Sequence, residues 1–563
     1  MSPQTGIVSV RHFLLAEAME STASREPPED LIRRLAELNQ IGIALSQEKD
    51  LDRLLETILI AAKKITSADG GTLYRRAAGQ DLLTFEIIRT DSLNIAMGGT
   101  TGVKIPFPPL QLRDARGREN LSMVAAYAVL KGRTVAIADA YQERGFDFSG
   151  TKAFDRHTGY HSTSFLTVPM KNHEDEIIGV LQLINAKDRV TGATTAFTET
   201  DQRLAESLAS QAAVALTNRL LIVQLENLFE SFVNLLNKAI DEKSPYTAGH
   251  CLRVPVLTML LAEAVHETKT GPHALWNMTD LDRYELKIAA LLHDCGKVTT
   301  PVHVVDKATK LQTIFDRIGL IDTRFEVLKR DAEIALLRAM TVPGADLKAL
   351  DQAYHQRLWD IQEDREFLRL CNIGGEAMSP ENQERVRAIA KKYPWTNPRG
   401  ATVDFLTENE IENLTVRAGT LTAAEREIIN HHVTVSIQML EALPWPKHLM
   451  NVPEYAGGHH ERMDGKGYPR GLKGDQMSVQ ARIMGIADIF EALTARDRPY
   501  KPGKTLTESL QILGNMRLNG HIDPELFDIF VRSRVYERYA KEFMDPAQID
   551  AVDVTKIPGY SGD

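Results

Sequence analysis

The second half of the chain gathers histidines and aspartates into short stretches that an apolar core does not require. The members most able to do chemistry are His293, Asp294, the neighbouring pair His431 and His432, His459, His460 and Asp488. Imidazole and carboxylate groups without cysteine are typical of sites for Fe, Mn, Zn or Ni, and Asp294 could bridge two ions. Two ions about 3.5–4 Å apart are a standard device for hydrolysing phosphodiesters. The set therefore predicts a dinuclear centre that acts on a phosphate ester.

Most of these residues fall in segments that we predict to be helical. The apolar stripe of "LKIAALLH" (286–293) runs into His293 at helical spacing, and Lys297 comes one turn later on the same face. Asp488 lies in an otherwise apolar helix, where a carboxylate costs several kcal/mol, roughly, unless a cation or hydrogen bonds offset the cost. His250 lies at a predicted helix start, where a ligand role and a structural hydrogen bond are equally good interpretations.

The loop that follows His459 and His460 combines glycines with cations. Its sequence, "ERMDGKGYPRGLK" (461–473), contains glycines that permit tight backbone turns beside a ligand. It also supplies four cationic side chains, those of Arg462, Lys466, Arg470 and Lys473. Any single one of them is more often a solvated surface charge. Together they concentrate positive charge in a protein whose net charge is −10.

The elements that must position these groups divide the chain into parts. A chain of 563 residues exceeds what one hydrophobic core usually organises, which predicts two or three domains. Helical segments followed by short β-like runs up to about residue 216 predict an α+β domain with an antiparallel sheet. From residue 241 to about 545 nearly everything is typical of helix.

Between these parts, residues 217–240 lack proline and glycine and carry apolar residues in steps of four and three. These residues are Leu221, Leu225, Leu228, Phe232 and Leu235. The spacing predicts a parallel coiled-coil helix that makes the protein a homodimer. The alternative is an amphipathic helix packed on its own domain.

Composition narrows the cellular setting and the partners. Three cysteines without motif spacing do not form a disulfide framework and indicate a reducing compartment. The start of the chain lacks the pattern of a secretory signal, and no run approaches the ~20 apolar residues of a membrane span. We therefore expect a cytoplasmic protein with no membrane contact. The net charge of −10 argues against a nucleic acid as partner.

"HDCGK" (293–297) and "HHERMDGKGYP" (459–469) resemble the two signatures of the HD-GYP family of metal-dependent phosphohydrolases. The resemblance continues through "PYTAGH", "LTAAEREIINHH" and "ARIMGIADIFEALTARDRPYKP" and covers most of 241–545. It implies an all-helical domain that hydrolyses cyclic di-GMP to linear pGpG, to GMP, or to both. It implies the metal ligands His293, Asp294, His432, His459, His460 and Asp488, with His432 chosen over His431 because it keeps the usual distance to "IQML". His250 is a less certain ligand, because Tyr246 stands where some members have a glutamate for a third ion.

The same resemblance implies further roles and partners. Asp294 and Lys297 would be catalytic, and Lys297, Tyr468, Arg498 and Lys501 would contact the substrate. The cofactors would be two divalent transition-metal ions, Fe or Mn first and Zn or Ni next, and the GYP loop would contact signalling proteins. Two alternatives stay open: a low-turnover scaffold that binds cyclic di-GMP, and a hydrolase of another cyclic dinucleotide such as cyclic GMP-AMP.

One departure from the family is large. His293 and His432 lie 139 positions apart, whereas in most members the equivalent residues are much closer. The extra residues form an insert at about 304–418 with strong helical character. It is either a helical hairpin on the surface, or a lid or dimer contact.

The first domain resembles a GAF domain of the cyclic-nucleotide-phosphodiesterase type, through "TVAIADAYQERGFD", "DRHTGYHSTSFLTVPMKN" and "EIIGVLQLINAKD". Asn185, Phe197 and Asp201 match its signature, whereas Ala186 and Gln202 replace the usual lysine and glutamate. The resemblance implies a cyclic nucleotide as a candidate ligand, in a pocket that the sequence does not define.

The predicted fold class is multidomain, an α+β GAF domain joined by a long helix to an all-α HD-type phosphohydrolase domain. The predicted parts are an N-terminal tail (1–30), the GAF domain (31–216), the linking helix (217–240), the HD-GYP domain (241–545) with its insert, and a C-terminal tail (546–563).

Overall fold

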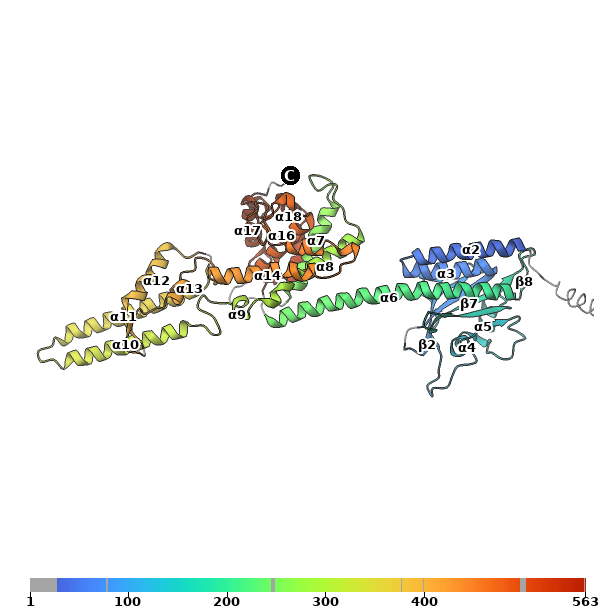
Figure 1. Cartoon of the computed structure of the whole chain (residues 1–563), viewed down its shortest axis with the longest axis horizontal. Helices are drawn as coiled ribbons and strands as arrows, with labels where there is room; N and C mark the ends of the chain where they lie inside the picture. The colour runs from blue at the N-terminus through green and yellow to red at the C-terminus, as the bar shows by residue number, and fades with distance from the viewer. Residues whose placement is uncertain are drawn as a thin grey trace, which may run out of the picture. The chain divides into compact units, whose positions relative to one another are not determined.

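The protein is described by a computed structural model that covers residues 28–76, 79–244, 249–375, 377–397, 399–496, 503–560 and 562. These residues form two compact units that divide between Leu228 and Phe229 (Figure 1). The first unit contains a sheet and helices, and the second is almost entirely helical.

An antiparallel sheet of eight strands organises the first unit, in the order β3-β2-β1-β7-β6-β5, with β4 beside β2 and β8 beside β7. The strands are β1 (Ala68–Arg75), β2 (Leu82–Thr90), β3 (Ile95–Gly98), β4 (Leu110–Gln111), β5 (Val135–Ile137), β6 (Phe165–Lys171), β7 (Ile177–Lys187) and β8 (Thr194–Thr195). The helices are α2 (Pro28–Gln47), α3 (Leu51–Thr66), α4 (Val124–Lys131), α5 (Ser149–Thr158) and α6 (Glu199–Lys243).

Helices cover both faces of this sheet. The apolar sides of α2, α3 and the first part of α6 pack on one face, where Leu73 and Leu181 of the central strands are fully buried. Smaller clusters around α4, Ile137 and Phe148 fill the other face. Because helices flank it on both sides, the central strand β1 is buried along almost its whole length.

The residues that match the GAF signature hold this fold together. The Asn185 side chain accepts the N–H of Thr163 at 2.7 Å and donates to the carbonyl of His161 at 2.8 Å. Asp201 accepts the Thr198 hydroxyl at 2.7 Å at the start of α6, and its other carboxylate oxygen pairs with Arg34 of α2. Their contacts therefore stabilise the structure, and they give no evidence of a ligand.

Helix α6 is one continuous helix of 45 residues that contains the predicted linker. Leu221, Leu225, Leu228, Phe232 and Leu235 are between 50% and 67% exposed along it. On another face, Val233 and Ile240 are buried in the core of the second unit. One face of α6 thus packs on its own domain, as in the alternative interpretation, whereas the heptad face is exposed and its pairing in a homodimer stays a prediction.

The same helix also meets the length and composition of a membrane span, which the sequence analysis did not predict. One window of 18 residues has a mean hydropathy of 1.3, and 28% of that window is buried. Soluble core helices pass the same test. Because the exposed apolar residues recur at heptad spacing on one face, the pattern favours helix pairing.

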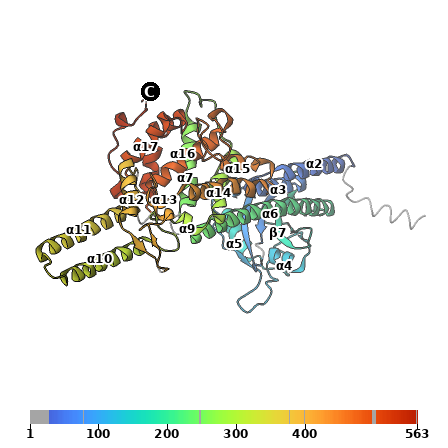
Figure 2. The same ribbon diagram turned by 60° about the vertical axis from the view of Figure 1, so that its left-hand side comes forward.

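The second unit is built from helices (Figures 1 and 2). They are α7 (His250–Glu267), α8 (Asp280–Leu292), α9 (Val302–Val305), α10 (Ile318–Met340), α11 (Leu347–Asn372), α12 (Pro380–Lys392), α13 (Glu408–Leu414), α14 (Ala423–Glu441), α15 (Val452–Gly457), α16 (Val479–Thr494), α17 (Leu506–Leu518), α18 (Pro524–Arg532) and α19 (Val535–Phe543). A short hairpin joins β9 (Trp395–Thr396) to β10 (Thr402–Val403).

One hydrophobic cluster joins α7, α8 and α14 to α19 into the main core of this unit. Local sequence signals begin its helices: Thr279 and Asp282 form a capping box at α8, and Thr422 and Glu425 form another at α14. The predicted C-terminal tail contributes to the core as well, because Ile557 is buried in it.

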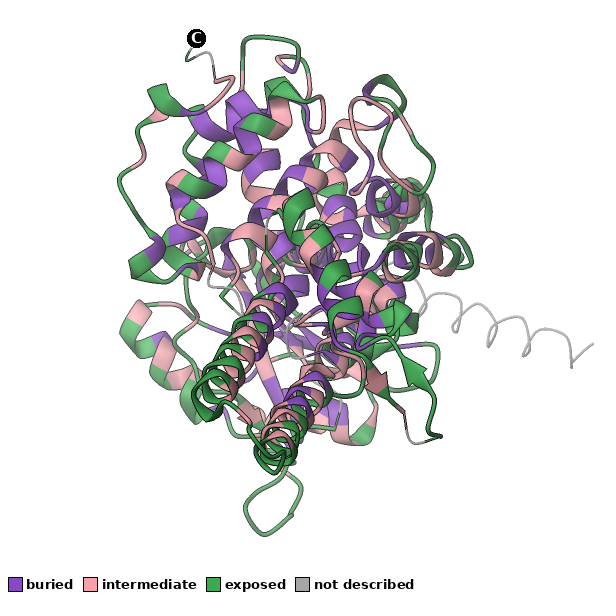
Figure 3. Ribbon diagram, turned by 90° about the vertical axis from the view of Figure 1, so that its left-hand side faces the viewer, coloured by how far each residue is buried: buried purple, intermediate pink, exposed green. Residues whose placement is uncertain are grey.

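The insert has a hydrophobic core of its own, which includes Phe325, Ile361 and Tyr393. Its helices α10 and α11 lie side by side, and between residues 329 and 360 neither has a buried residue (Figure 3). The two ends of the insert are joined by Lys307, whose buried Nζ contacts Asn413 Oδ1 and Glu425 Oε2, each at 2.7 Å. The insert is therefore a separately packed arm whose ends are held together.

Candidate metal centre and substrate pocket

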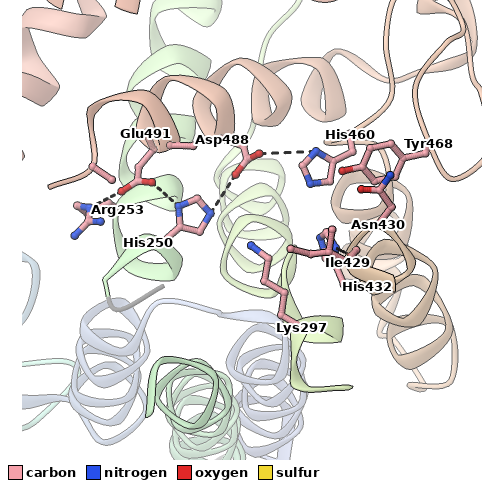
Figure 4. A pocket seen from close by; sticks show the side chains of 12 residues that line it. His250, Arg253, Lys297, Ile429, Asn430, His432, His460, Tyr468, Asp488 and Glu491 are labelled. Atoms are coloured by element: carbon pink, nitrogen blue, oxygen red, sulfur yellow. Dashed lines mark hydrogen bonds and ion pairs between the residues drawn. The ribbon is translucent and has the colours of Figure 1, made fainter. Parts of the chain in front are cut away.

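Seven histidines and acids from five helices meet in the main core of the second unit. They are His250 on α7, His293 and Asp294 after α8, His432 on α14, His459 and His460 after α15, and Asp488 on α16. Figure 4 shows several of them around a cavity of about 230 Å³. The structure thus brings together every residue that the sequence analysis named as a metal ligand.

The segment "HDCGK" is not a continuation of α8. The helix ends at Leu292, and a 3-10 turn (Cys295–Thr299) follows Asp294. The sequence predicts that Lys297 shares a helical face with His293. The structure shows that it does not, because the chain leaves the helix before Lys297. The turn brings its Nζ to 2.5 Å from Asp294 Oδ2. In this partly buried position the Lys297 ammonium would stabilise both the Asp294 carboxylate and an anionic substrate.

A glycine makes this turn fit against α14. The N–H of Gly296 donates to Ser436 Oγ at 2.9 Å. A Cβ at Gly296 would lie 2.0 Å from the carbonyl oxygen of His432, far inside van der Waals contact. The close approach of the two backbones therefore requires glycine, and it sets His432 opposite Asp294.

Three histidines share one hydrogen-bonding pattern. The Nδ1 atoms of His293, His432 and His459 lie 2.7, 2.6 and 2.5 Å from the carbonyl oxygens of the residues three positions earlier. An N–H at Nδ1 leaves the lone pair at Nε2, as in histidines that ligate metals. The three Nε2 atoms are buried and have no hydrogen-bond partner among the described residues.

Asp294 lies between two groups of candidate ligands. Its Oδ2 is 3.3 Å from Nε2 of both His250 and His293, and its Oδ1 is 3.1 Å from Nε2 of His432. Asp294 Oδ1 and the Nε2 of His432 are both acceptors, so neither can donate to the other. A cation bonded to both would remove this conflict, since metal–nitrogen and metal–oxygen bonds are about 2.0–2.2 Å long.

The ligand atoms form two triads, with His250, His293 and Asp488 in one and His432, His459 and His460 in the other. A third group, His293, Asp294 and His459, joins the two triads, and within each group the ligand atoms lie within 4.8 Å of one another. With Asp294 between them, the donors suit two divalent ions that share a carboxylate. The residues present therefore fit the predicted metal pair.

The pKa values of His459, His460 and Asp294 agree with this use, whereas burial would lower the pKa of His250 but Glu491, Asp294 and Asp488 outweigh it and raise that pKa well above its ordinary value. Burial lowers the pKa of His460 to about 4 and, together with the rings of His460 and His293, lowers the pKa of His459 well below its ordinary value. Burial on its own would raise the pKa of Asp294, but Lys297 and His293 outweigh it and hold that pKa well below the usual range. Neutral imidazoles and an ionised carboxylate are the forms that bind metals.

The sequence analysis missed two residues that support His250. Glu491 on α16 accepts a hydrogen bond from His250 Nδ1 and another from Arg253 Nε, the latter at 2.6 Å. The bond at Nδ1 leaves Nε2 directed at Asp488, 3.1 Å away. Glu491 lies three positions after Asp488, and no motif marks it, so helical spacing was the only signal available.

The loop with the GYP tripeptide forms one side of the cavity. Glu461 is buried and accepts the N–H groups of Arg470 and Leu472, at 2.7 and 2.9 Å. Tyr468 stacks on His460 with ring centroids 4.8 Å apart. These contacts fix the Tyr468 ring beside the metal ligands.

The remaining predicted residues fall outside this arrangement. His431 is exposed, which agrees with the choice of His432. Arg498 and Lys501, together with Tyr246, lie outside the described residues. No described residue of the insert lines the cavity.

Comparison with known proteins agrees with this division. Residues 50–216 match the family model of the GAF domain, and residues 247–382 and 407–526 match two models of the HD domain. The chain therefore carries a GAF domain followed by an HD domain, as predicted. The first HD match extends through much of the insert, to residue 382, and the second begins near the end of the insert, at residue 407.

Its curated relatives are named as phosphodiesterases of cyclic dinucleotides. The chain is 38% identical over 122 residues to 3'3'-cGAMP-specific phosphodiesterase 1 of Vibrio cholerae, covering 22% of this chain and 27% of that protein. It is 26% identical over 298 residues to 3'3'-cGAMP-specific phosphodiesterase 3 of Vibrio cholerae, covering 53% and 37%. It is 44% identical over 75 residues to a cyclic di-GMP phosphodiesterase of Pseudomonas aeruginosa, covering 13% and 17%. The chain thus spans well under half the length of these relatives.

Proposed function

We propose that the chain is a metal-dependent phosphodiesterase of the HD-GYP type that hydrolyses cyclic di-GMP to linear pGpG, GMP or both. The observation that carries the proposal is the buried set of three Nε2 atoms without partners, gathered around an ionised Asp294. Such a set is costly to bury unless it binds cations. Curated relatives with cyclic dinucleotides in their names support the class of substrate.

Two divalent ions held here would polarise a phosphoryl oxygen and increase the acidity of a bound water. The residues of the chain do the positioning. Asp294 offers one oxygen to each triad, and its charge favours cations between them. His293, His432 and His459 are held by backbone carbonyls, so their lone pairs keep one direction.

Lys297 is the group in the cavity that would bind the substrate phosphate. Burial would lower its pKa, but Asp294 and Asp488 raise it, so the ammonium stays protonated at neutral pH. Asn430, which also lines the cavity, offers an amide donor and an acceptor beside it. The cavity thus combines a cation for the phosphate with an amide for a polar edge of the substrate.

A second candidate substrate is cyclic GMP-AMP, because two of the three relatives described above are named as specific for 3'3'-cGAMP. Purified protein loaded with Fe or Mn is incubated with cyclic di-GMP, 3'3'-cGAMP and cyclic di-AMP, and products are separated by chromatography. Linear dinucleotide from cyclic di-GMP supports the proposal. Turnover of 3'3'-cGAMP alone favours the second candidate. Tight binding without turnover would leave a signalling scaffold as the function.

Regulation is proposed to pass through α6, which links the GAF domain to the HD domain. Ligand at the GAF domain would change how the heptad faces of two copies pair in a homodimer, and so shift the activity of the HD domain. We place this enzyme in the cytoplasm, with the GYP loop available to signalling partners.

A further inference from the structure

The cavity at the metal centre has a neighbour on the other side of one stacked pair of rings. A second cavity of about 440 Å³ shares His460, Tyr468, Asp488 and Ala492 with the first, which has about 230 Å³. His460 and Tyr468, stacked at 4.8 Å, line both. The two cavities therefore share part of their lining at the candidate metal ligands, and we refer to them as the first and second lobes.

The second lobe contains cations that the first lobe lacks. Arg462 and Lys466, from the loop after His460, line it. Asp464 holds the Arg462 guanidinium in place through Nε at 3.0 Å and Nη2 at 2.8 Å. These two bonds use only part of the five N–H groups of an arginine. The Lys466 side chain is 79% exposed, and its Nζ is 3.8 Å from Asp464.

Apart from the shared carboxylate of Asp488, the rest of the second lobe is apolar or neutral. Ile489 and Leu493 of α16 line it, and His521 lies near Arg462. Burial, with the charge of Arg462, lowers the pKa of His521, so its ring is neutral and can both donate and accept a hydrogen bond. A lobe with cations at one part and apolar groups at another suits a phosphate joined to a flat heterocycle.

The first lobe is too small to hold a whole cyclic dinucleotide, which is the reason to expect a second lobe in the binding site. Pockets for drug-sized ligands usually have about 300–1,000 Å³, and the first lobe is smaller than that range. A cyclic dinucleotide carries two phosphates and two bases. When one phosphate lies at the metal ligands and Lys297, the other half of the molecule must leave the first lobe.

We propose that the second lobe is the subsite for the half of the cyclic dinucleotide that is not being cut, with Arg462 and Lys466 binding its phosphate and Ile489 and Leu493 contacting its base. This inference rests on the proposed function. We assign these contacts equally to the bound substrate and to the transition state, so their loss should raise KM and leave kcat nearly unchanged.

The test compares R462A/K466A with the matched control R470A in metal-loaded full-length protein. Arg470 belongs to the same loop, but it pairs with Glu441 at 3.2 Å and lines neither lobe. For the cyclic dinucleotide that the wild type cleaves best, we expect R462A/K466A to raise KM about tenfold or more while kcat changes less than about twofold. R470A should match the wild type.

A small diester, bis(4-nitrophenyl) phosphate, provides the second readout because it is too small to reach both lobes. Its kcat/KM should fall far less than that of the cyclic dinucleotide in R462A/K466A. Equal losses on both substrates would show a structural defect and overturn the subsite. The single variant K466E, at a largely exposed position, guards against misfolding and should also raise KM.

The outcomes separate the two proposals. An unchanged KM in R462A/K466A and K466E, with an active wild type, would overturn the subsite and leave the proposed function intact. A wild type that cleaves the small diester but no cyclic dinucleotide would overturn both.

Discussion

At the scale of single residues, the centre depends on how each imidazole is held. His293, His432 and His459 each direct Nδ1 at a carbonyl three residues earlier, so the same local geometry is repeated within α14 and just after α8 and α15. The backbone thereby fixes both the tautomer and the direction of Nε2. A ligand set oriented in this way needs little rearrangement to bind a cation.

Substituting Gly296 should disturb the centre without removing a ligand. In G296A the new Cβ would clash with the carbonyl of His432, so α14 must move away from Asp294. Overpacking of this kind costs about 1–3 kcal/mol. We expect a lower Tm and a lower metal content by elemental analysis. G319A is the control, because Gly319 in α10 has open space around it; a G296A protein with the Tm and metal content of G319A would contradict the account.

Glu491 should act on the metal through His250. E491Q keeps the shape of the side chain but removes the charge that holds His250 and Arg253. Loss of a partner of a metal ligand typically lowers metal affinity by about 10–100-fold. A competition titration with a chelating dye measures this effect. E441Q, at an exposed carboxylate, should bind metal like the wild type, and the same result for E491Q would refute the supporting role.

Sequence reasoning reached the ligands of the centre but not the residues that hold them. His293, Asp294 and Asp488 could be predicted from the sequence, because histidines and aspartates beside apolar helical patterns are unusual. The role of Glu491 could not be predicted from the sequence, because its partner His250 lies 241 positions earlier and only the fold brings the two together. The helical face predicted for Lys297 was wrong, because the chain leaves the helix at His293 and continues as a 3-10 turn.

At the scale of elements, the insert is an arm whose packing depends on a few buried ion pairs. Arg324 of α10 donates to Glu410 of α13, with Nη1 3.0 Å from Oε2. Glu410 also accepts the N–H of Thr407 at 2.9 Å. Burial by itself would raise the pKa of Glu410, but the bonds from Arg324 and Thr407 outweigh it and lower that pKa below 4.5.

This shift predicts a dependence of the insert's stability on pH. Because the folded pKa lies below the unfolded value, the ionised Glu410 stabilises the insert above about pH 4.5, and the contribution is lost as the pH falls through the folded pKa. Hydrogen bonds to charged groups contribute about 1.5–3 kcal/mol. E410Q should therefore exchange the amides of α10 and α13 about tenfold faster or more at pH 7.

Hydrogen exchange read by mass spectrometry measures the difference, with wild type and variant compared at the same pH. The difference in exchange rate between E410Q and the wild type should become smaller when both proteins are measured below pH 4. E412Q, at an exposed glutamate of the same helix, serves as the control and should exchange like the wild type. Equal protection of the α10 amides in E410Q and the wild type at pH 7 would contradict a stabilising role for the Arg324–Glu410 ion pair.

Helix content and the existence of the insert followed from the sequence, since strong helical patterns and a long gap between His293 and His432 are local signals. The independent core of the insert could not be predicted, because Phe325 of α10, Ile361 of α11 and Tyr393, which follows α12, meet only in the folded structure. The lid interpretation finds no support in the described residues, which place no part of the insert in the cavity.

At the scale of the whole molecule, α6 is the element that belongs to both units. Its buried face, with Val233 and Ile240, ties it to the HD domain, and its heptad face is left exposed. Leucine and phenylalanine at heptad spacing are costly to leave in water and pair readily with a second copy. The homodimer and the coupling between domains are therefore predictions about the same surface.

Charges on the heptad face should separate the two copies. In L225D/L228D, two carboxylates would replace side chains that are 66% and 67% exposed, so folding of the single chain should be unaffected. We expect light scattering after gel filtration to show a dimer for the wild type and a monomer for the variant. E226K, a charge change that helical spacing places away from the heptad face, should remain dimeric. A wild-type monomer would refute the pairing.

The order of the domains could be predicted from the sequence, because each domain carries recognisable motifs. The role of the GAF signature residues was not, since Asn185 and Asp201 form contacts within the fold that a motif match cannot distinguish from ligand binding. Only the folded structure distinguishes a residue that binds a ligand from one whose contacts stabilise the domain.

The most direct test of the account is anomalous X-ray scattering from crystals of the protein loaded with Mn. The account predicts two anomalous peaks on either side of the Asp294 carboxylate, one within bonding distance of His293 and the other within bonding distance of His459. Peaks elsewhere on the protein, or none at this centre in metal-replete crystals, would contradict it.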